Sequence, residues 1–480
     1  MRDVARRAVE RAVAAGADYA DARAVSRRSQ GVATRNRQVD SVSDAESEGI
    51  GVRVLLGGAW AFACDRRLTD AGADAAARRA VEFARASATR SSGPVELGPP
   101  VISRGEYRSA AARDPIAVPL EEKVDVCLRA EEELARPGIE ISRASVRAQR
   151  ELRAFASSQG GETFQDLSEC GGGIAALAVS DGRVQTRSYP SAHGGSSAQG
   201  GWEYVEALAL EREAPRVAEE ALALLQAPPC PAGVTTLVVD AEQMQLQVHE
   251  SVGHPTELDR VYGTEVAYAG TSFLAPGDLG SLRYGSELMN VTADAASPGG
   301  LGTFAWDDEG VAARREPVVE AGILRGFLTS RETSARLGGS SAGGSMRADG
   351  WSRMPLVRMT NLHLEPGEGS LEDLLADVDD GVYVATNKSW SIDDKRLNFQ
   401  FGTEVAWEIK RGRLGAMLRD ATYAGVTPVF WASLDAVAGP DAWRMNGLTT
   451  CGKGQPGQQA HVSHGAAPAR FRNILVGVRP

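Results

Sequence analysis

Two histidines near the middle of the chain constrain its local structure more than any other feature of the sequence. His249 and His254 lie five residues apart, and Glu250 directly follows the first of them. Neutral imidazoles are good zinc ligands, and a carboxylate beside them can accept a proton from a water molecule that the metal activates. The segment therefore predicts a hydrolytic metal site with Glu250 as the catalytic carboxylate. The plainer interpretation is a pair of surface histidines at a helix end.

The five-residue spacing imposes a condition on the backbone. On an ideal helix, two side chains five positions apart point about 140° away from each other, so a straight helix could not direct both rings at one ion. Gly253 can adopt backbone angles that other residues avoid, and Pro255 disfavours helical geometry at the residue before it. We therefore expect a widened or unwinding last turn, such as a π-bulge. At the start of this helix, Asp240 and Gln243 are spaced as a capping box.

A third ligand must come from elsewhere in the chain, because catalytic zinc usually has three protein ligands and keeps one position for solvent. Cys451 lies in a polar, glycine-flanked loop, and the neighbouring Lys453 favours its thiolate form. The sequence leaves other donors open: His461, His464, His363 or a carboxylate. His193, in a loop rich in glycine and serine, is expected to be an exposed residue and not a ligand.

Charge and cysteine content limit the possible partners and compartment. The net charge of −11 and the sequence pI near 5.3 argue against binding to nucleic acid or to an anionic membrane. No stretch approaches 18 apolar residues, and the N-terminus lacks the apolar run of a signal peptide. The five cysteines are scattered and include no C-x-x-C pair. A cytoplasmic protein without a disulfide framework is expected.

The 480 residues are enough for two or three domains. Breaks rich in proline, glycine and serine predict an N-terminal α/β subdomain (1–92), a linker (93–112), a middle α/β subdomain (113–226) and a C-terminal domain (227–480). The expected fold class is α+β. It combines a two-layer N-terminal α/β region, with antiparallel or mixed sheets, and a larger strand-rich C-terminal domain that carries the metal helix.

Several motifs, in order along nearly the whole chain, resemble the TldD/PmbA family of bacterial and archaeal metallopeptidases. The matching segments are Gly49–Leu56, His249–His254, Tyr262–Glu265, Asp307–Gly310, Arg358–Asn361, and Cys451–Lys453 with Gln455. The resemblance implies that His249, His254 and Cys451 bind one Zn²⁺ per chain. It also implies that Glu250 is the catalytic residue. The acidic run Asp307–Glu309 could lie behind the histidines, although a solvated turn is the simpler interpretation.

The function implied by this resemblance is zinc-dependent hydrolysis of unfolded or flexible peptides, bound in extended form in a narrow cleft. Arg347 and Arg358 could line that cleft or hold a substrate carboxylate. The family suggests a homodimer, or a heterodimer with a zinc-less subunit of the TldE/PmbA type. One alternative is a non-catalytic peptide-binding or scaffolding subunit, whose structural zinc would have a fourth protein ligand such as His461 or His464. Another is a hydrolase with Cys451 as nucleophile.

Overall fold

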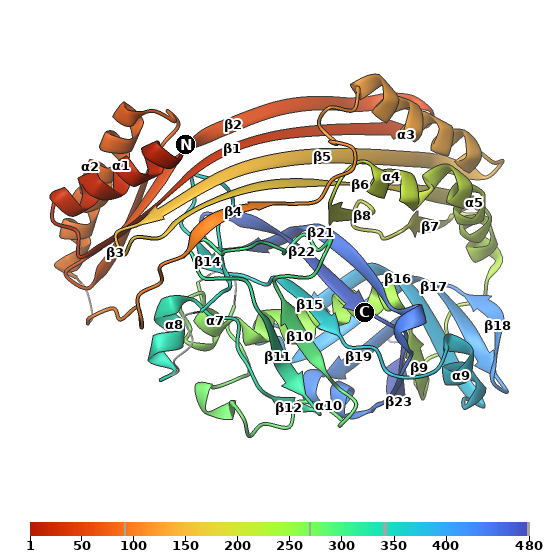
Figure 1. Ribbon diagram of the computed structural model, residues 1–480. Coiled ribbons are helices and arrows are strands. Elements are labelled where there is room, and N and C mark those ends of the chain that lie inside the picture. The colour runs from red at the N-terminus through yellow and green to blue at the C-terminus, as the bar shows by residue number, and fades with distance from the viewer. Residues whose placement is uncertain (91–92, 268–269, 339–342, 478–480) are drawn as a thin grey trace.

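A long antiparallel sheet arches over a strand-rich C-terminal half in the computed structural model, which describes residues 1–90, 93–267, 270–338 and 343–477 (Figure 1). The strand order is β3-β2-β1-β5-β6-β4, and β7 and β8 also pair with β6. The strands are β1 (Tyr19–Arg35), β2 (Gln38–Leu56), β3 (Ala59–Asp65), β4 (Arg104–Arg108), β5 (Ile139–Ser157), β6 (Glu162–Ser180), β7 (Arg183–Tyr189) and β8 (Ser196–Gln199). Their length lets one sheet carry a helical cluster at each end.

Two groups of helices cover the ends of this sheet and leave its middle facing the C-terminal half (Figure 1). At one end lie α1 (Arg2–Ala14) and α2 (Asp70–Ala88), and at the other lie α3 (Leu120–Leu134), α4 (Glu203–Leu208) and α5 (Leu210–Gln226). Thr69 caps α2 by accepting a hydrogen bond from the backbone of Gly72. The face of α2 against the sheet is mostly alanine, whose small side chains allow close packing.

The N-terminal and middle regions share hydrogen bonds through this sheet. Strand β1 pairs with β5 from Asp21–Ser157 to Arg35–Arg143, so both regions belong to one sheet although their helices form separate apolar cores. The segment 93–112, expected to be only a linker, contributes β4 as an edge strand parallel to β6. The domain boundaries themselves stay a proposal.

The C-terminal half contains a ring of strands and a second sheet. Strands β16, β9, β23, β19 and β17 follow one another, and β16 also pairs with β17, which closes the ring. This sheet comprises β9 (Gly233–Val239), β16 (Asp380–Ile392), β17 (Asn398–Lys410), β18 (Arg413–Leu418), β19 (Thr422–Val426), β20 (Leu434–Val437) and β23 (Ala469–Val476). The second sheet has the order β12-β11-β10-β15-β22-β21. Its strands are β10 (Val291–Asp294), β11 (Arg315–Glu320), β12 (Ile323–Leu324), β15 (Asn361–Leu364), β21 (Arg444–Lys453) and β22 (Gln458–Ala466).

The helix that carries the two histidines contacts strands of both sheets, β16 in the ring and β15, β21 and β22 in the second. The short elements around it are α6 (Ala241–Val248), η1 (His249–Gly253), η2 (His254–Thr256), α7 (Leu258–Val261), α8 (Arg331–Arg336), α9 (Leu371–Ala376), α10 (Thr427–Ala432), β13 (Met346–Arg347) and β14 (Leu356–Val357). The 3-10 turns η3 (Pro276–Asp278) and η4 (Pro440–Ala442) complete this half. The mixed α and β composition with antiparallel and mixed sheets confirms the expected fold class.

Buried ion pairs join the arched sheet to the C-terminal half. Arg153 Nη1 lies 2.8 Å from Asp308 Oδ1, and Arg53 Nη2 lies 3.0 Å from Glu309 Oε1. Asp307 accepts backbone hydrogen bonds at 2.9 Å within its own turn. The acidic run is therefore neither solvated nor placed behind the histidines: its members dock the two halves together or stabilise the turn that does so.

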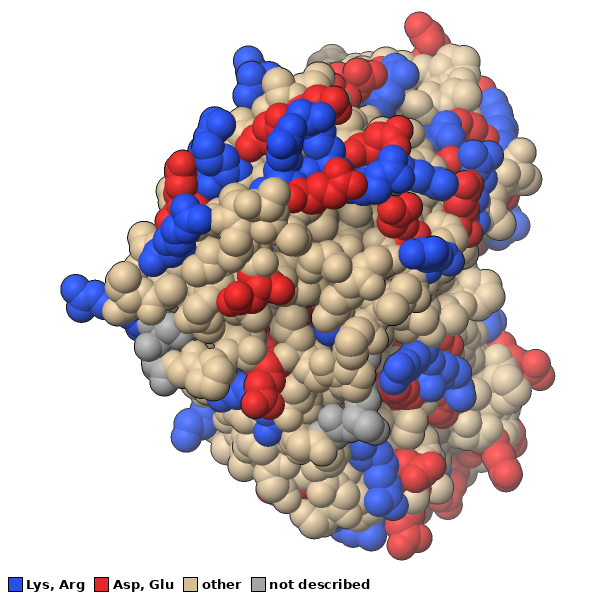
Figure 2. All heavy atoms as spheres, turned by 60° about the vertical axis from the view of Figure 1, so that its left-hand side comes forward, with Lys and Arg blue, Asp and Glu red and all other residues tan. Residues whose placement is uncertain are grey.

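Charged side chains of both signs intermingle on the face where α1 and α2 come forward (Figure 2). One pair on these helices is Arg7 with Asp74, whose atoms Nη2 and Oδ2 are 2.7 Å apart. Pairs on the surface contribute roughly 0–1 kcal/mol each, and this one is half-buried. Within the described residues, no helix has the length and apolar character needed to cross a bilayer.

Candidate metal centre

The last turn of the histidine helix is widened. After α6 the backbone continues as the π-helical turn η1 and then the 3-10 turn η2, and the N–H of His254 donates to the carbonyl of His249 five residues back. The extra residue in the turn brings the two rings together, with centroids 4.8 Å apart and planes at 87°. The expected π-bulge is confirmed.

A side chain at Gly253 would meet the buried Met359. A Cβ built there would lie 2.1 Å from Met359 Sδ, so a larger residue would force either that side chain or the turn to move. The cap at the start of α6 differs from expectation. Asp240 accepts from the backbone of Glu242 at 3.2 Å, whereas Gln243 donates its side chain to Tyr423 Oη at 2.8 Å and does not complete a capping box. That bond ties the helix to β19 in the ring.

The structure brings Cys451 to the two histidines. One donor atom from each of the three residues lies within 4.8 Å of the others, and His254 Nε2 is 4.0 Å from Cys451 Sγ. Zinc bonds of about 2.0–2.1 Å to nitrogen and 2.3 Å to sulfur place two ligand atoms at most about 4.4 Å apart. Small inward shifts of these side chains would therefore let them share one ion. All three are nearly fully buried, and their donor set fits zinc.

A chain of hydrogen bonds fixes the tautomer of His249. His464 Nδ1 lies 3.2 Å from the carbonyl oxygen of Leu362, which can only accept, so this nitrogen carries the proton. His464 Nε2 then has the lone pair, and it lies 2.7 Å from His249 Nδ1, which must donate to it. The lone pair of His249 is consequently on Nε2. A partner that holds the second ring nitrogen in this way is typical of metal-ligating histidines.

The second histidine is oriented by a carboxylate. His254 Nδ1 lies 3.1 Å from Glu257 Oε2, while Arg260 Nη2 is farther from the same nitrogen at 3.4 Å. Because a carboxylate accepts, Nδ1 is the protonated nitrogen and Nε2 is left free for a metal. Glu257 is held in turn by Arg260 Nε at 2.6 Å and by Lys453 Nζ at 3.3 Å.

The protonation states of His254 and Cys451 also suit metal binding. Burial lowers the pKa of His254 to about 4, so the ring is neutral at neutral pH and its lone pair is available. Burial alone would raise the pKa of the Cys451 thiol, but the adjacent Arg358 guanidinium and His254 outweigh it and bring the pKa down to about 7. Arg358 Nη2 lies 3.2 Å from Sγ. A substantial fraction of thiolate is therefore present at neutral pH even without a metal.

Glu250 lies beside the first ligand and is held by a residue that the sequence did not single out. Arg396, in the turn between β16 and β17, places Nη1 2.5 Å from Glu250 Oε2. Glu250 is 5% exposed, and Arg396 has a left-handed φ of +63° that turns the hairpin tip toward it. A fixed carboxylate next to a metal-binding histidine is a suitable proton acceptor.

The remaining histidines contribute in other ways. His461 pairs with Glu169 at 2.5 Å, and His363 contacts Ser297 and accepts from the backbone of Gly465. Among the described residues, the group of possible ligands thus contains Cys451 and neither of these, while His464 acts through His249. His193 is not exposed as expected. Its ring packs edge-on against Trp390, with centroids 5.1 Å apart, and its Nε2 is buried.

The two arginines expected at a substrate cleft line one pocket between the arched sheet and the C-terminal half. Arg347 donates to the carbonyls of Met359 at 3.0 Å and His461 at 2.7 Å, and Arg358 contacts Cys451. Whether they contact substrate stays a proposal.

Two neutral imidazoles, a thiol of lowered pKa and a fixed carboxylate beside them are the donor set of a metal-dependent hydrolase. Comparison with known proteins agrees. The chain belongs to the PmbA/TldA metallopeptidase family, whose C-terminal domain matches residues 232–477, its central domain 113–226 and its domain 1 residues 20–85.

Relatives cover most of the chain. A protein of Methanothermobacter thermautotrophicus named a metalloprotease is 30% identical over 461 residues, or 96% of this chain and 95% of the relative. A metalloprotease of Methanocaldococcus jannaschii is 28% identical, with 88% and 89% covered. A zinc metalloprotease TldD homolog of Saccharolobus solfataricus is 27% identical over 51% of this chain and 52% of its own.

Solved structures share the fold. The crystal structure of a putative modulator of a DNA gyrase from Thermotoga maritima superposes with a TM-score of 0.77 at 18% identity, covering 99% of both chains. TldE from Thermococcus kodakarensis gives a TM-score of 0.73 at 15% identity, covering 99% of this chain and 100% of its own. At such identities the likeness shows the fold alone.

Proposed function

We propose that this protein is a zinc-dependent peptidase that hydrolyses unfolded or flexible peptides bound in extended form. The observation that carries the proposal is the convergence of His249 Nε2, His254 Nε2 and Cys451 Sγ, each in the state that binds a metal, beside Glu250. Zinc held by these three residues would supply a Lewis acid that acidifies water and polarises the substrate carbonyl.

The chain's own residues have distinct tasks in this reaction. Glu250 accepts a proton from the attacking water and returns it to the leaving amine. Its Oε2 is engaged by Arg396, and we assign the proton to Oε1. His464 and Glu257 hold the two imidazoles in the tautomer that the metal requires.

Peptide binding by strand addition fits the position of β21. This strand carries Cys451 and is the terminal strand of its sheet in the described chain, and its first half packs on β8 around Gly447. An extended peptide paired along its second half would run past the metal ligands, and main-chain hydrogen bonds would bind it with little demand on sequence.

Other functional readings have less support. A structural zinc would need a fourth protein ligand, but in the described chain His461 pairs with Glu169 and His464 serves His249. We further propose a cytoplasmic location, in keeping with five free cysteines, and a dimer formed with a second copy or with a TldE-like subunit.

The experiment is hydrolysis of an unstructured, internally quenched peptide by the purified protein. A metal chelator should abolish cleavage, and Zn²⁺ should restore it. Glu250→Gln should reduce turnover by about 100-fold or more, in line with the usual contribution of a general base. Cleavage that persists in chelator would instead favour Cys451 as a nucleophile.

A further inference from the structure

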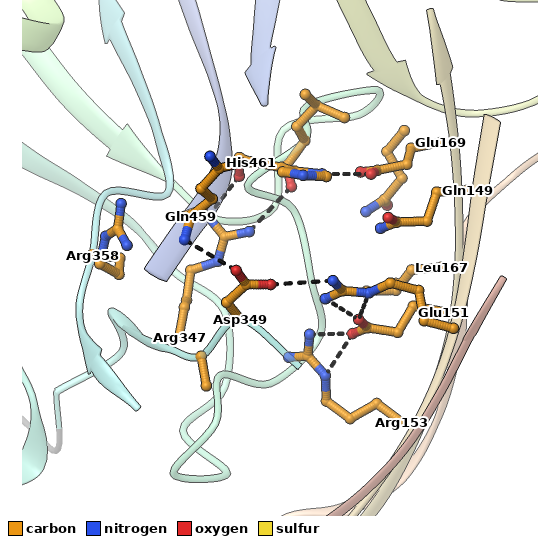
Figure 3. Close-up of a pocket in the computed structure, with 15 residues that line it drawn as sticks. Gln149, Glu151, Arg153, Leu167, Glu169, Arg347, Asp349, Arg358, Gln459 and His461 are labelled. Carbon is orange, nitrogen blue, oxygen red and sulfur yellow. Dashed lines mark hydrogen bonds and ion pairs between the residues drawn. The ribbon is translucent and has the colours of Figure 1, made fainter. Parts of the chain in front are cut away.

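A small charged pocket lies between the arched sheet and the C-terminal half (Figure 3). Gln149, Glu151, Arg153 and Glu169 line it from the sheet, and Arg347 and His461 line it from the other side. Its volume is about 60 Å³. Since a single water needs about 10–15 Å³ of such space, the pocket has room for a small polar group but not for a large side chain.

Every carboxylate that lines the pocket already has a close side-chain partner. Glu151 lies 2.6 Å from Arg27 and 2.5 Å from Arg153, and Asp349 lies 3.1 Å from Arg27. Glu169 hydrogen-bonds His461 and attracts Arg147 and Arg347 without contacting them. These acidic groups therefore make their close contacts with other residues.

Arg347 has no carboxylate in contact within the part of the chain that the structure describes. There its guanidinium donates to backbone carbonyls, those of Met359, His461 and, at 3.4 Å, Leu301. Burial without a carboxylate in contact lowers the pKa of Arg347 to about 10. A buried cation in this state is costly, and an anion bound beside it would relieve that cost.

Arg147 is a second cation with no carboxylate in contact among the described residues, and it lines an adjoining pocket. That pocket shares Gln149, Glu169, Gln459 and His461 with the first. Its Nε donates to Ser197 Oγ at 2.7 Å and its Nη1 to Thr449 Oγ1, both neutral acceptors. Its Nη2 is buried and has no hydrogen-bond partner within the described chain. Gln459 is exposed, so this region reaches the surface.

The pockets adjoin the metal ligands through the β21–β22 hairpin. Thr449 precedes Cys451 by two residues on β21, and Ala460, which pairs with Cys451 across the hairpin, lines the first pocket. Arg358 lines the same pocket and contacts Cys451 Sγ at 3.2 Å. Neighbouring strands lie roughly 5 Å apart and extended chain advances about 3.3 Å per residue. A group on a bound peptide two or three residues from the metal could therefore enter the pocket.

We propose that Arg147 and Arg347 form a subsite for a carboxylate of the peptide substrate. Guanidinium groups bind carboxylates by paired, charge-assisted hydrogen bonds, and among the described residues no carboxylate lies in contact with either of these two. The carboxylate is either the C-terminus of the peptide or an Asp or Glu side chain near the scissile bond. The inference rests on the proposed peptidase function and names its substrate class.

The test compares three fluorescent peptides of one sequence: one with a free C-terminus, its C-terminal amide, and the amide with one Gln replaced by Glu. Binding is measured by anisotropy with Glu250→Gln, and hydrolysis with the wild-type protein. A carboxylate-bearing peptide should bind and be cleaved on the order of 10-fold better than the plain amide, with the difference in Kd and KM. The arm that gains affinity identifies the source of the carboxylate.

Variants locate the effect. Arg147→Met and Arg347→Met should bring the ratio between carboxylate and amide peptides toward one. Arg143→Met, on the same strand as Arg147 but exposed, should keep the wild-type ratio. The subsite proposal would be overturned if Glu250→Gln, with both arginines present, bound all three peptides equally. It would also be overturned if folded Arg147→Met and Arg347→Met kept the wild-type ratio between carboxylate and amide peptides. If the protein cleaves all three peptides equally well, the subsite proposal is wrong and the peptidase proposal stands. If it binds the carboxylate peptides selectively but cleaves none of the three, the peptidase proposal is wrong and the subsite proposal stands.

Discussion

Arg396 Nη1 lies 2.5 Å from Glu250 Oε2, although the two residues are 146 positions apart in the chain. The hairpin formed by β16 and β17 carries the arginine to the end of the histidine helix. This contact restrains the carboxylate that we assign as the proton acceptor, and it links the ring of strands to the metal centre.

Removing that restraint should impair turnover without removing the metal. Arg396→Met leaves Glu250 buried without its partner and free to turn, and misplacement of a catalytic group by about 1 Å can cost roughly 100-fold in rate. We expect kcat to fall by that order while metal content stays at the wild-type level. The neighbouring Lys395→Met, on the exposed side of the same turn, is the control. A wild-type kcat in Arg396→Met would show that Glu250 needs no restraint from this residue.

His464 should be important for metal affinity because it fixes the tautomer of His249. His464→Leu removes the acceptor for His249 Nδ1, and loss of such a partner typically weakens metal binding 10- to 100-fold. Competition with a chromophoric chelator measures this change. His363→Gln, in the neighbouring strand β15, retains an acceptor for the Gly465 backbone and should bind the metal normally. Equal affinities for the two variants would contradict the proposed relay.

The Cys451 thiol should ionise near pH 7 in metal-free protein. Its pKa is lowered from the usual 9.0, so thiolate forms as the pH rises through about 7 and is lost below it. Burial raises the pKa of Cys127 and Cys170 to about 12 and of Cys230 to about 11, so these thiols stay protonated over that range. Thiolate absorbance in the ultraviolet should show one transition near neutrality.

Two variants assign that transition. Cys451→Ser should abolish it, and Arg358→Met should shift it to higher pH because the closest cation is removed. A transition that survives in Cys451→Ser would mean that another thiol is responsible.

Lys453 should matter for stability, in addition to its contact with the Glu257 carboxylate that orients His254. Its ammonium is buried, 2.7 Å from Asp259 Oδ1 and 2.7 Å from the carbonyl of Val357. Lys453→Met leaves the Asp259 carboxylate buried and unpaired, which should lower the free energy of unfolding by roughly 3–5 kcal/mol. The double variant Lys453→Met/Asp259→Asn should recover part of that loss in urea denaturation, since the uncompensated charge is gone. No recovery would mean that Lys453 acts mainly through Glu257 or the carbonyl of Val357.

Features set by neighbouring residues were predictable from sequence. The π-turn was expected next to Gly253 and Pro255 and it forms there, but not through the backbone preferences of these residues. Gly253 (φ −59°) and His254 (φ −62°) both keep right-handed helical angles. The close approach of Met359 to Gly253 is the feature of this turn that favours a glycine. The α+β class was likewise predictable from the order of strand-like and helix-like segments. Strand β4 was not, since its residues Arg104–Arg108 carry no apolar alternation and are held at a sheet edge by pairing with β6.

The residues that contact His249 and Glu250 could not be predicted from the local sequence. His464 meets His249 across 215 residues, through a helix packed on the sheet that contains β15 and β22. Before the register of these strands is known, His461, His363 and His464 are equivalent candidates. The role of Arg396 depends in the same way on the length of the β16–β17 hairpin. Spacing alone carries no signal for such contacts.

The most direct test of the account is the metal content of the purified protein and two variants, measured by elemental analysis alongside a check of folding. We expect one Zn²⁺ per chain in the wild-type protein and in Glu250→Gln, because Glu250 is not a ligand, and little or none in Cys451→Ala. A folded Cys451→Ala variant that retains a full equivalent of zinc would contradict the claim that two imidazoles and this thiolate hold the ion.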